Sequence, residues 1–542
     1  MHTNNKWTSL LPAIQDICDI SGIPGVSFGI VENNEVYTAS LGYADIAGEV
    51  PCDSNTTFVL GSLTKGMTAA LVASLHSDGT IPSWDTPLKT LLPEFHREDI
   101  YGEVTLTDLL THRTGLASLN SLWLASNNKP YLPKSEAIQI FNHAPGIQPF
   151  RTEFVYNNFG YEIFGQVIEK AARITFATAL QDRLLDPLRM SRTYYTGETR
   201  DNEARPYAAL EDGSLVPTAL PLFGEDVVMG PAGGVRSSVN DLLTLYQAFM
   251  SAARSEMMLI DGTGSHGQLN PPQVIQGIDK LWKGHQHLPF KSLREHSYGL
   301  GWARAQLPAI LGQGYDPDSV NPMVGVGAPS QLALYHGGDI PGFEAYNLLL
   351  SESNSAVVVL VNSQTLNGGV RWIGELLVET LLDNGHNAPD YLKLARKSAE
   401  AEAERAKRIN KALAVGRKVD LSSRPLDAYV GTYFNAAENF FIQIVHSKDK
   451  SHIEVSYIGR QDDTFSLLPY QEDSFYWTLT RDEYARLGRG SLFPSVGYFI
   501  LKFGSAKDGS DVSCLWWHHQ SDLPYPGEMF KKMESSNIRS EL

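Results

Sequence analysis

A serine and a lysine three residues apart, Ser62 and Lys65, stand at the start of the apolar run LTKGMTAALV. On a helix these two side chains share one face and can touch. A serine hydroxyl becomes a nucleophile when a base removes its proton, and a neutral lysine amine is such a base. Burial and the positive end of a helix both favour the neutral amine. Alternatively, Ser62 only caps the helix and Lys65 extends to the surface, and these residues alone favour that simpler interpretation.

A tyrosine and an asparagine in a second segment carry groups that suit the same chemistry. Tyr156 and Asn158 precede an apolar run of helical period in the segment VYNNFGYEIFGQVIE. A phenol beside a cation has a lowered pKa and can exchange a proton with a serine. The amide of Asn158 can hold both Lys65 and a substrate carbonyl. Taken alone, a loop tyrosine followed by a capping asparagine explains the segment better.

A third segment, LYHGGD, ends an apolar strand with His336, Gly337 and Gly338. Glycines at this place let a substrate approach the backbone closely. One strand amide, together with the amide of Ser62, could then form an oxyanion hole. The alternative is a simple turn after a strand.

These three motifs occur in one order along the chain: S-x-x-K at 62–65, Y-x-N at 156–158 and H-x-G at 336–338. In this order they resemble the serine β-lactamase and penicillin-binding-protein superfamily, and within it the class C-like esterase, D-aminopeptidase and transesterase branch. The resemblance extends over residues 8–385. Further stretches that resemble the family are TLTDLLTHRTGL at 105–116, LLDPLRMSRT at 184–193, GPAGGVRSSVNDLLTL at 230–245 and YGLGW at 298–302.

The resemblance implies a role for each motif residue. Ser62 would be the acylated nucleophile, and Lys65 its neighbouring base or proton relay. Tyr156 would activate Ser62, or later a water or alcohol, and reprotonate the leaving group. Which of Lys65 and Tyr156 takes the first proton stays open, because coupled groups share one titration. Asn158 would orient Lys65 and the substrate, and the amides of Ser62 and Asp339 would form the oxyanion hole.

The third motif departs from the family, because His336 stands where β-lactamases and transpeptidases usually carry the lysine of K-T-G. A permanent cation that would hold a substrate carboxylate is thereby replaced by a mostly neutral ring. We therefore expect poor hydrolysis of penicillins and cephalosporins, and small-molecule esters, amides or acyl thioesters as substrates. His336, Gly338 and Asp339 would lie on the substrate side of the site.

The order of predicted elements indicates an α/β (α+β) fold. Strand patterns near the N-terminus and from residue 297 onward enclose a mainly helical region at 62–250, which predicts an antiparallel sheet flanked by helices, with an inserted helical region. We expect a β-lactamase-like hydrolase domain at 1–385 and a helical linker at 386–423. Short aromatic strands at 424–542 predict a small all-β domain, a closed barrel or sandwich that resembles a lipocalin.

Composition excludes several other classes of protein. The formal net charge of −17 argues against nucleic acid as a partner. No apolar run is long enough to cross a membrane, and no basic stretch followed by an apolar one begins the chain. Three scattered cysteines fit a reducing compartment, so we expect a cytoplasmic protein. We expect neither metal nor organic cofactor, and the sequence predicts no oligomeric state.

We therefore expect a serine hydrolase that works through an acyl-enzyme on Ser62. One alternative is an acyltransferase that moves an acyl group to a small-molecule alcohol. Another is a catalytically silent scaffold or binding protein of the same fold. The Gly- and Pro-rich stretch at 306–330 is longer than a hairpin needs, and either overhangs the pocket to select the acyl group or is a surface excursion.

Overall fold

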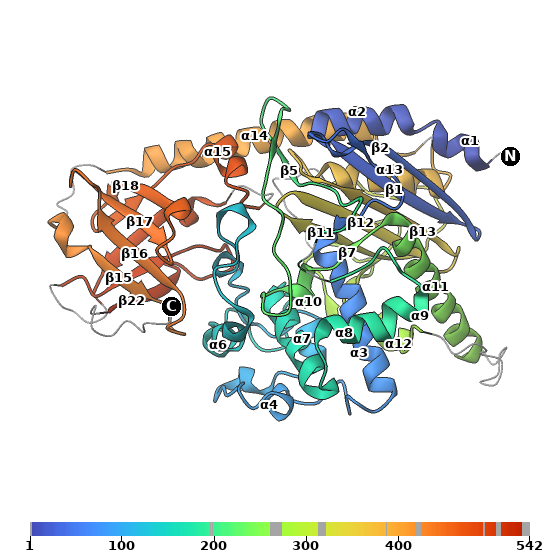
Figure 1. The fold of residues 1–542 in the computed structure, drawn as a ribbon, viewed down its shortest axis with the longest axis horizontal. Coiled ribbons are helices and arrows are strands. Elements are labelled where there is room, and N and C mark those ends of the chain that lie inside the picture. The colour runs from blue at the N-terminus through green and yellow to red at the C-terminus, as the bar shows by residue number, and fades with distance from the viewer. Residues whose placement is uncertain are drawn as a thin grey trace.

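A computed structural model shows a large α/β body and a small barrel, joined along one side by a long helix, α14 (Tyr391–Gly416) (Figure 1). The structure describes residues 3–195, 197, 199–260, 274–312, 321–385, 387–418, 424–490, 494–505 and 511–533. Within these ranges no helix is long and apolar enough to cross a membrane.

The α/β body is built on a nine-stranded antiparallel sheet with the order β3-β2-β1-β13-β12-β11-β10-β9-β8. Its strands are β1 (Gly25–Glu32), β2 (Glu35–Asp45), β3 (Val50–Pro51), β8 (Gln286–His287), β9 (His296–Tyr298), β10 (Ala303–Gln306), β11 (Leu332–Ile340), β12 (Phe343–Leu350) and β13 (Ser355–Val361). Asn33 and Asn34 join β1 to β2 with positive φ angles of 52° and 70°, as a tight hairpin turn requires. β1 pairs with β13, which confirms a sheet assembled from both ends of this part of the chain.

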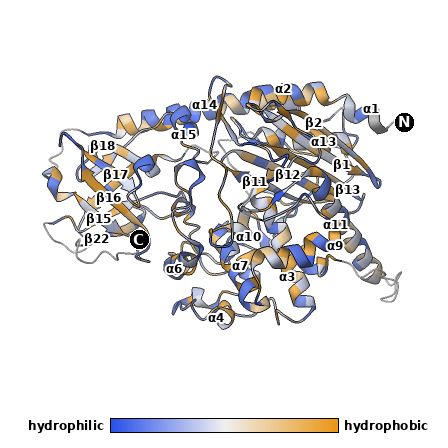
Figure 2. Cartoon of the chain, in the orientation of Figure 1, coloured by the Kyte–Doolittle hydropathy of each residue, from blue (hydrophilic) through white to orange (hydrophobic). Residues whose placement is uncertain are grey.

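Helices cover both faces of this sheet. α2 and α13 pack on one face and α11 on the other, and β13 between them is buried along its whole length. The strands accordingly carry mostly hydrophobic colours, whereas polar residues alternate with apolar ones along α14 (Figure 2). The helices of this body are α1 (Thr3–Thr8), α2 (Leu11–Ser21), α3 (Thr64–Ser77), α4 (Leu88–Leu91), α5 (Leu106–Leu110), α6 (Ala137–His143), α7 (Asn158–Ala172), α8 (Phe176–Leu180), α9 (Asp186–Leu188), α10 (Gly230–Gly233), α11 (Val239–Ile260), α12 (Ile278–Leu281) and α13 (Gly369–Leu381).

Shorter elements complete the body. Two 3₁₀ turns bear on the site, η1 (Gly61–Leu63) and η3 (Asn120–Leu122). The small strands are β4 (Phe58–Val59), β5 (Tyr207–Ala209), β6 (Leu215–Pro217), β7 (Arg236–Ser237) and β14 (Ser363–Gln364).

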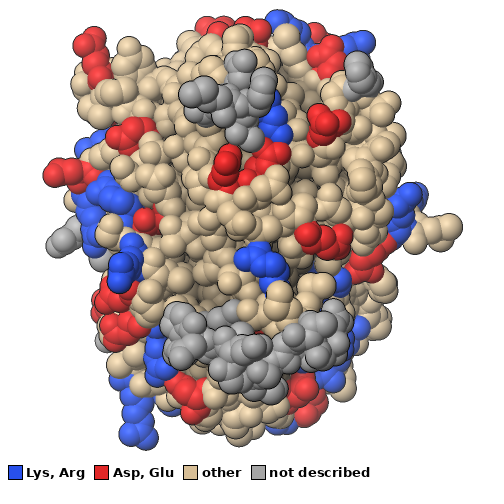
Figure 3. Space-filling view, turned by 90° about the vertical axis from the view of Figure 1, so that its right-hand side faces the viewer, with Lys and Arg blue, Asp and Glu red and all other residues tan. Residues whose placement is uncertain are grey.

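On the end of the molecule opposite the barrel, acidic and basic side chains are interspersed among uncharged ones (Figure 3).

The C-terminal part is a closed antiparallel barrel. The sequence predicts either a closed barrel or a sandwich, and the structure shows the barrel. Its strands are β15 (Gly431–Phe434), β16 (Phe441–His446), β17 (Ile453–Tyr457), β18 (Thr464–Gln471), β19 (Ser474–Tyr476), β20 (Ile500–Gly504), β21 (Cys514–Trp517) and β22 (Glu528–Met533). Buried rings fill its interior; Tyr457, for example, stacks on Trp517 at 4.7 Å between centroids. Barrels of this size have room for side chains or for one small ligand, and here side chains occupy the space.

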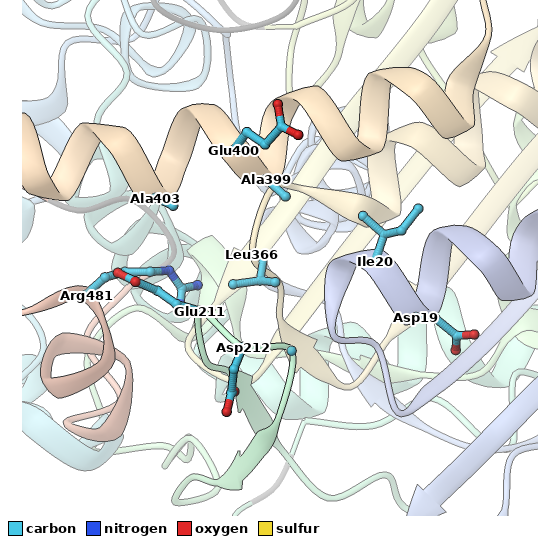
Figure 4. Close-up of a pocket in the computed structure, with 10 residues that line it drawn as sticks. Asp19, Ile20, Glu211, Asp212, Leu366, Ala399, Glu400, Ala403 and Arg481 are labelled. Carbon is cyan, nitrogen blue, oxygen red and sulfur yellow. The ribbon is translucent and has the colours of Figure 1, made fainter.

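The barrel also carries the short helix α15 (Arg481–Arg486), which docks on the α/β body. Arg481 is 7% exposed, and its guanidinium donates hydrogen bonds to the carbonyl oxygens of Ala209 and Thr365. Figure 4 shows Arg481 and Glu211 beside a hollow that Ala399 of α14 also lines. The barrel therefore lies firmly against the body at this contact.

Candidate active site

Ser62 lies in η1, the turn that leads directly into α3. This turn presses against β11 so closely that two positions accept only glycine. Gly61 has φ +51°, and a Cβ there would lie 2.6 Å from the amide nitrogen of Asp339. A Cβ on Gly338 would lie 2.0 Å from the carbonyl oxygen of Leu60. The glycine of the third motif thus allows the strand to approach the turn that carries Ser62.

Lys65, the second residue of α3, is completely buried. Its Nζ lies 2.9 Å from Ser62 Oγ, 2.8 Å from Asn158 Oδ1 and 2.8 Å from the carbonyl oxygen of Ala232. Within the described part of the chain, no carboxylate forms an ion pair with this amine. Burial therefore lowers the pKa of Lys65 well below its ordinary value of 10.5.

The three oxygens around this amine can accept the three N–H groups of an ammonium, and they also accommodate the neutral form. A neutral amine has two N–H groups and one lone pair. The two N–H groups can donate to Asn158 Oδ1 and to the carbonyl of Ala232, which both only accept. The lone pair is then left for the hydroxyl of Ser62. The geometry thus suits transfer of the serine proton to Lys65.

Tyr156 reaches the same serine from the segment before α7. Its hydroxyl lies 2.8 Å from Ser62 Oγ, and Lys65 Nζ lies 4.9 Å from the centre of its ring. The buried ring of His112 packs on Tyr156 with centroids 4.3 Å apart. Nδ1 of His112 accepts the backbone N–H of Asn157, so this ring supports the segment from below.

Asn158, the first residue of α7, is held by a second asparagine. Its Nδ2 donates to Oδ1 of Asn120 over 3.1 Å, which turns its own Oδ1 toward Lys65. Asn120 lies in η3 and reaches the site from a different segment. The orientation of the Asn158 amide is therefore fixed by Asn120.

His336 lies in β11 but away from the substrate side. The residue is 2% exposed, its Nε2 is 2.9 Å from the hydroxyl of Tyr298, and its Nδ1 is 2.6 Å from the carbonyl of Gly337. Burial, with a contribution from Lys65, lowers the pKa of His336 to about 3. The ring is therefore neutral, as expected, but the structure does not place it among the residues that line the pocket.

A pocket of about 590 Å³ opens in front of Ser62 and lies between the α/β body and the barrel. The body contributes Ser62, Asn120, Ser121, Trp123, Leu124, Tyr156, Asn158, Gly337, Asp339, Ile340 and Pro341. The linking helix contributes Arg405, and the barrel contributes Tyr484, Arg489, Gly490, Pro494, Ser495, Tyr498, His519, Gln520 and Ser521. The outer wall of the pocket is therefore made by the barrel.

The stretch at 306–330 does not make that wall in the part that is described. Gly325 donates its N–H to Glu379 of α13, and Ala309 pairs with Val324. Residues 313–320 lie outside the described residues. The outer wall of the pocket is thus supplied by the C-terminal barrel, and none of the described residues of 306–330 is among those that line it.

Within the described ranges, no three His, Cys, Asp or Glu side chains cluster as they would around a metal ion. His285 and His518, each from a histidine pair in the sequence, contact backbone carbonyls instead. His519 pairs with Glu528 at 2.8 Å.

Two residues of the site, His112 and Asn120, were missed as such by the sequence analysis. Both lie in short irregular segments without periodicity, Asn120 in the 3₁₀ turn η3, and His112 sits inside the stretch TLTDLLTHRTGL that resembles the family. Its position next to Tyr156 requires a positive φ of 56° and long-range packing. Only the family resemblance of that stretch offered a signal for His112, and Asn120 offered none.

The geometry agrees with what known proteins indicate. A family model described as Beta-lactamase matches residues 13–379. Since this match takes in more than half of the 542 residues, the chain belongs to the β-lactamase family, whose members are serine hydrolases.

Two curated relatives are hydrolases. The unguisins hydrolase ungD of Aspergillus violaceofuscus (strain CBS 115571) is 26% identical over 386 residues, which are 68% of this chain and 62% of that protein, so the match spans less than two thirds of its length. The unguisins hydrolase ungD' of Aspergillus campestris (strain IBT 28561) is 23% identical over 526 residues, 91% of this chain and 86% of that protein.

A solved structure shares the fold over nearly the whole chain. The octameric penicillin-binding protein homologue from Pyrococcus abyssi has a TM-score of 0.55 and 20% identity, covering 98% of this chain and 100% of that one. At this identity the likeness shows the fold alone.

Proposed function

We propose that this chain is a serine hydrolase that cleaves small-molecule esters or amides through an acyl-enzyme on Ser62. The observation that carries the proposal is the placement of Lys65 Nζ and the Tyr156 hydroxyl within 2.9 Å and 2.8 Å of one serine oxygen. The lowered pKa of Lys65 favours the neutral amine that can act as a base. The hydrolase names of the curated relatives support the same reaction class.

In the proposed reaction Ser62 Oγ attacks the substrate carbonyl while its proton passes to Lys65 Nζ. The amides of Ser62 and Asp339 would hold the oxyanion, and the closeness of Asp339 to Gly61 supports this pairing. The tetrahedral intermediate collapses when the bond to the leaving group breaks and Tyr156 protonates that group. Lys65 then returns a proton to Tyr156. Water repeats the sequence in reverse and releases the acid.

The buried neutral ring of His336 supports esters and amides over carboxylate-bearing β-lactams. The pKa of about 3 keeps His336 uncharged above pH 5, so this residue does not replace the cation of the K-T-G lysine; Arg489, which lines the pocket, is paired with Asp463. We therefore propose slow turnover of a chromogenic cephalosporin.

The proposal is tested with a fluorophosphonate probe, whose covalent adduct is located by intact-mass and peptide mass spectrometry. Wild-type protein should gain one adduct on Ser62, and Ser62→Ala should gain none. Absence of the adduct on the wild type would instead favour a silent scaffold. A panel of p-nitrophenyl esters, D- and L-aminoacyl anilides and a cephalosporin then defines the bond cleaved. Adding alcohols to the ester assays measures any partition toward acyl transfer.

A further inference from the structure

One of the barrel segments that reach the active site is the loop at residues 518–522, which follows β21. Gln520 of this loop accepts the backbone N–H of Asn120 at 2.8 Å, and its Nε2 donates to the hydroxyl of Ser118. Asn120 in turn holds the Asn158 amide, whose oxygen holds Lys65. An unbroken series of hydrogen bonds thus runs from the barrel to the base beside the nucleophile.

The loop is itself fixed to the barrel. The ring of His519 lies 4.9 Å from that of buried Trp517, and its Nε2 pairs with Glu528 at 2.8 Å. The indole N–H of Trp517 donates to the carbonyl of Tyr498 at 2.7 Å. The backbone carbonyl of His519 also accepts the hydroxyl of Ser121, so the loop contacts η3 at neighbouring residues. The barrel can therefore hold η3 in place.

We propose that Gln520 is a positioning residue for catalysis: by anchoring Asn120 it keeps the amide oxygen of Asn158 turned toward Lys65. This inference rests on the proposed function and adds to it a catalytic task for the barrel. If Asn158 turned over, its NH₂ group would face the amine and occupy the lone pair that Ser62 needs. The same NH₂ group would disfavour the ammonium and lower the pKa of Lys65 further.

The inference makes a prediction with a definite sign for the pH profile of acylation. The rate constant kinact for a fluorophosphonate probe is measured against pH, with KI obtained separately. Gln520→Ala should lower the plateau of kinact about tenfold or more with little change in KI, because the base is misplaced and the pocket is kept. In the Gln520→Ala variant, the part of the profile in which kinact rises with pH (its ascending limb) should move to lower pH. Gln520→Glu retains an acceptor for the Asn120 N–H and should restore most of the plateau.

Two substitutions of Asn120 test the same contacts without altering the barrel. Asn120→Leu removes the acceptor for Asn158 and should lower the plateau and move the limb to lower pH. Asn120→Asp keeps the acceptor and adds a negative charge, so the limb should move to higher pH while the plateau stays near the wild-type value. This pair carries the test if Gln520→Ala is unfolded at the assay temperature.

The matched control is Lys129→Ala, which breaks the exposed contact between Lys129 and Asp462 of the barrel at 2.8 Å. It removes a contact between the barrel and the segment that follows η3, but no link toward Lys65, so kinact should be unchanged. Equal losses in Lys129→Ala and Gln520→Ala, or limbs that move in one direction for both Asn120 variants, would overturn the inference. Failure of the proposed function is distinct, because wild-type protein would then form no adduct on Ser62.

Discussion

Two buried basic side chains lie near the pocket, and their surroundings differ. Lys65 of the α/β body is surrounded by a hydroxyl, an amide and a carbonyl. Arg489 of the barrel is 8% exposed and contacts the fully buried carboxylate of Asp463, with the hydroxyls of Ser126 and Tyr498 beside it.

This difference in partners gives the two groups opposite electrostatics. Burial lowers the pKa of Lys65, and within the described residues no counter-charge offsets it. Burial alone would also lower the pKa of Arg489, but the neighbouring tyrosines and Asp463 raise it well above its ordinary value. An unpaired buried amine becomes a base, whereas a paired buried guanidinium becomes a permanent structural contact between barrel and body.

The largest expected effect follows from removing the unpaired amine. Lys65→Met should reduce kinact for a fluorophosphonate about 10³- to 10⁴-fold, because no base remains next to Ser62. The melting temperature should rise at neutral pH. The unfolded lysine keeps its proton up to pH 10.5 and the folded one does not, so the native lysine lowers stability most at low pH and this cost disappears as pH rises to 10.5.

Lys65→Arg is the matched control for charge. A guanidinium does not lose its proton, so this variant should be as inactive as Lys65→Met and should be less stable than the wild type. An active Lys65→Arg enzyme would show that a cation, not a base, is needed beside Ser62.

Breaking the paired cation should affect stability first. Arg489→Met leaves Asp463 buried without its counter-charge and should lower the free energy of unfolding by about 3 kcal/mol, measured by urea denaturation. The double variant with Asp463→Asn should recover part of this loss. Lys129→Ala, which breaks an exposed pair, should change stability by less than about 0.5 kcal/mol. If Arg489→Met left the free energy of unfolding unchanged, Arg489 would not be a structural contact, and it would not differ from Lys65 in the way proposed.

The pH dependence of kinact sharpens the comparison. The rate should rise with pH as Lys65 loses its proton, and should level off well below pH 10.5 because the folded pKa is lowered. His336 adds no step above pH 5, since its pKa is about 3. If kinact instead rose around pH 10, the pKa of Lys65 would be close to its ordinary value, as for an amine exposed to water.

The smallest effect concerns the barrel interior beneath Arg489. The guanidinium lies 5.9 Å from the ring of Tyr457, whose buried hydroxyl has no hydrogen-bond partner among the described residues. Tyr457→Phe keeps the ring and removes the unsatisfied hydroxyl, so stability should rise by up to about 1 kcal/mol in urea denaturation. A loss of stability would indicate that the hydroxyl has a partner such as a buried water.

The fold and the chemical motifs were accessible from sequence because they are local. The two strand-like runs on either side of Asn33 and Asn34 and the S-x-x-K spacing each carry their own signal. The last barrel strand, β22, carries a weak signal in the sequence, because only Phe530 of EMFKKM is buried and its neighbours Met529 and Lys531 are exposed. The roles of Asn120 and Gln520 could not be predicted from the sequence, because they depend on a contact between residues that are 400 positions apart along the chain.

The last strand of the barrel determines when the barrel can close during synthesis of the chain. β22 pairs with both β21 and β15, so the ring of strands closes only when residues 528–533 have been added. Because synthesis proceeds from the N-terminus, the hydrolase body is made long before this closure. Until residues 528–533 have been made, a growing chain would thus lack the closed barrel whose loop contacts Asn120 beside Ser62 and Lys65.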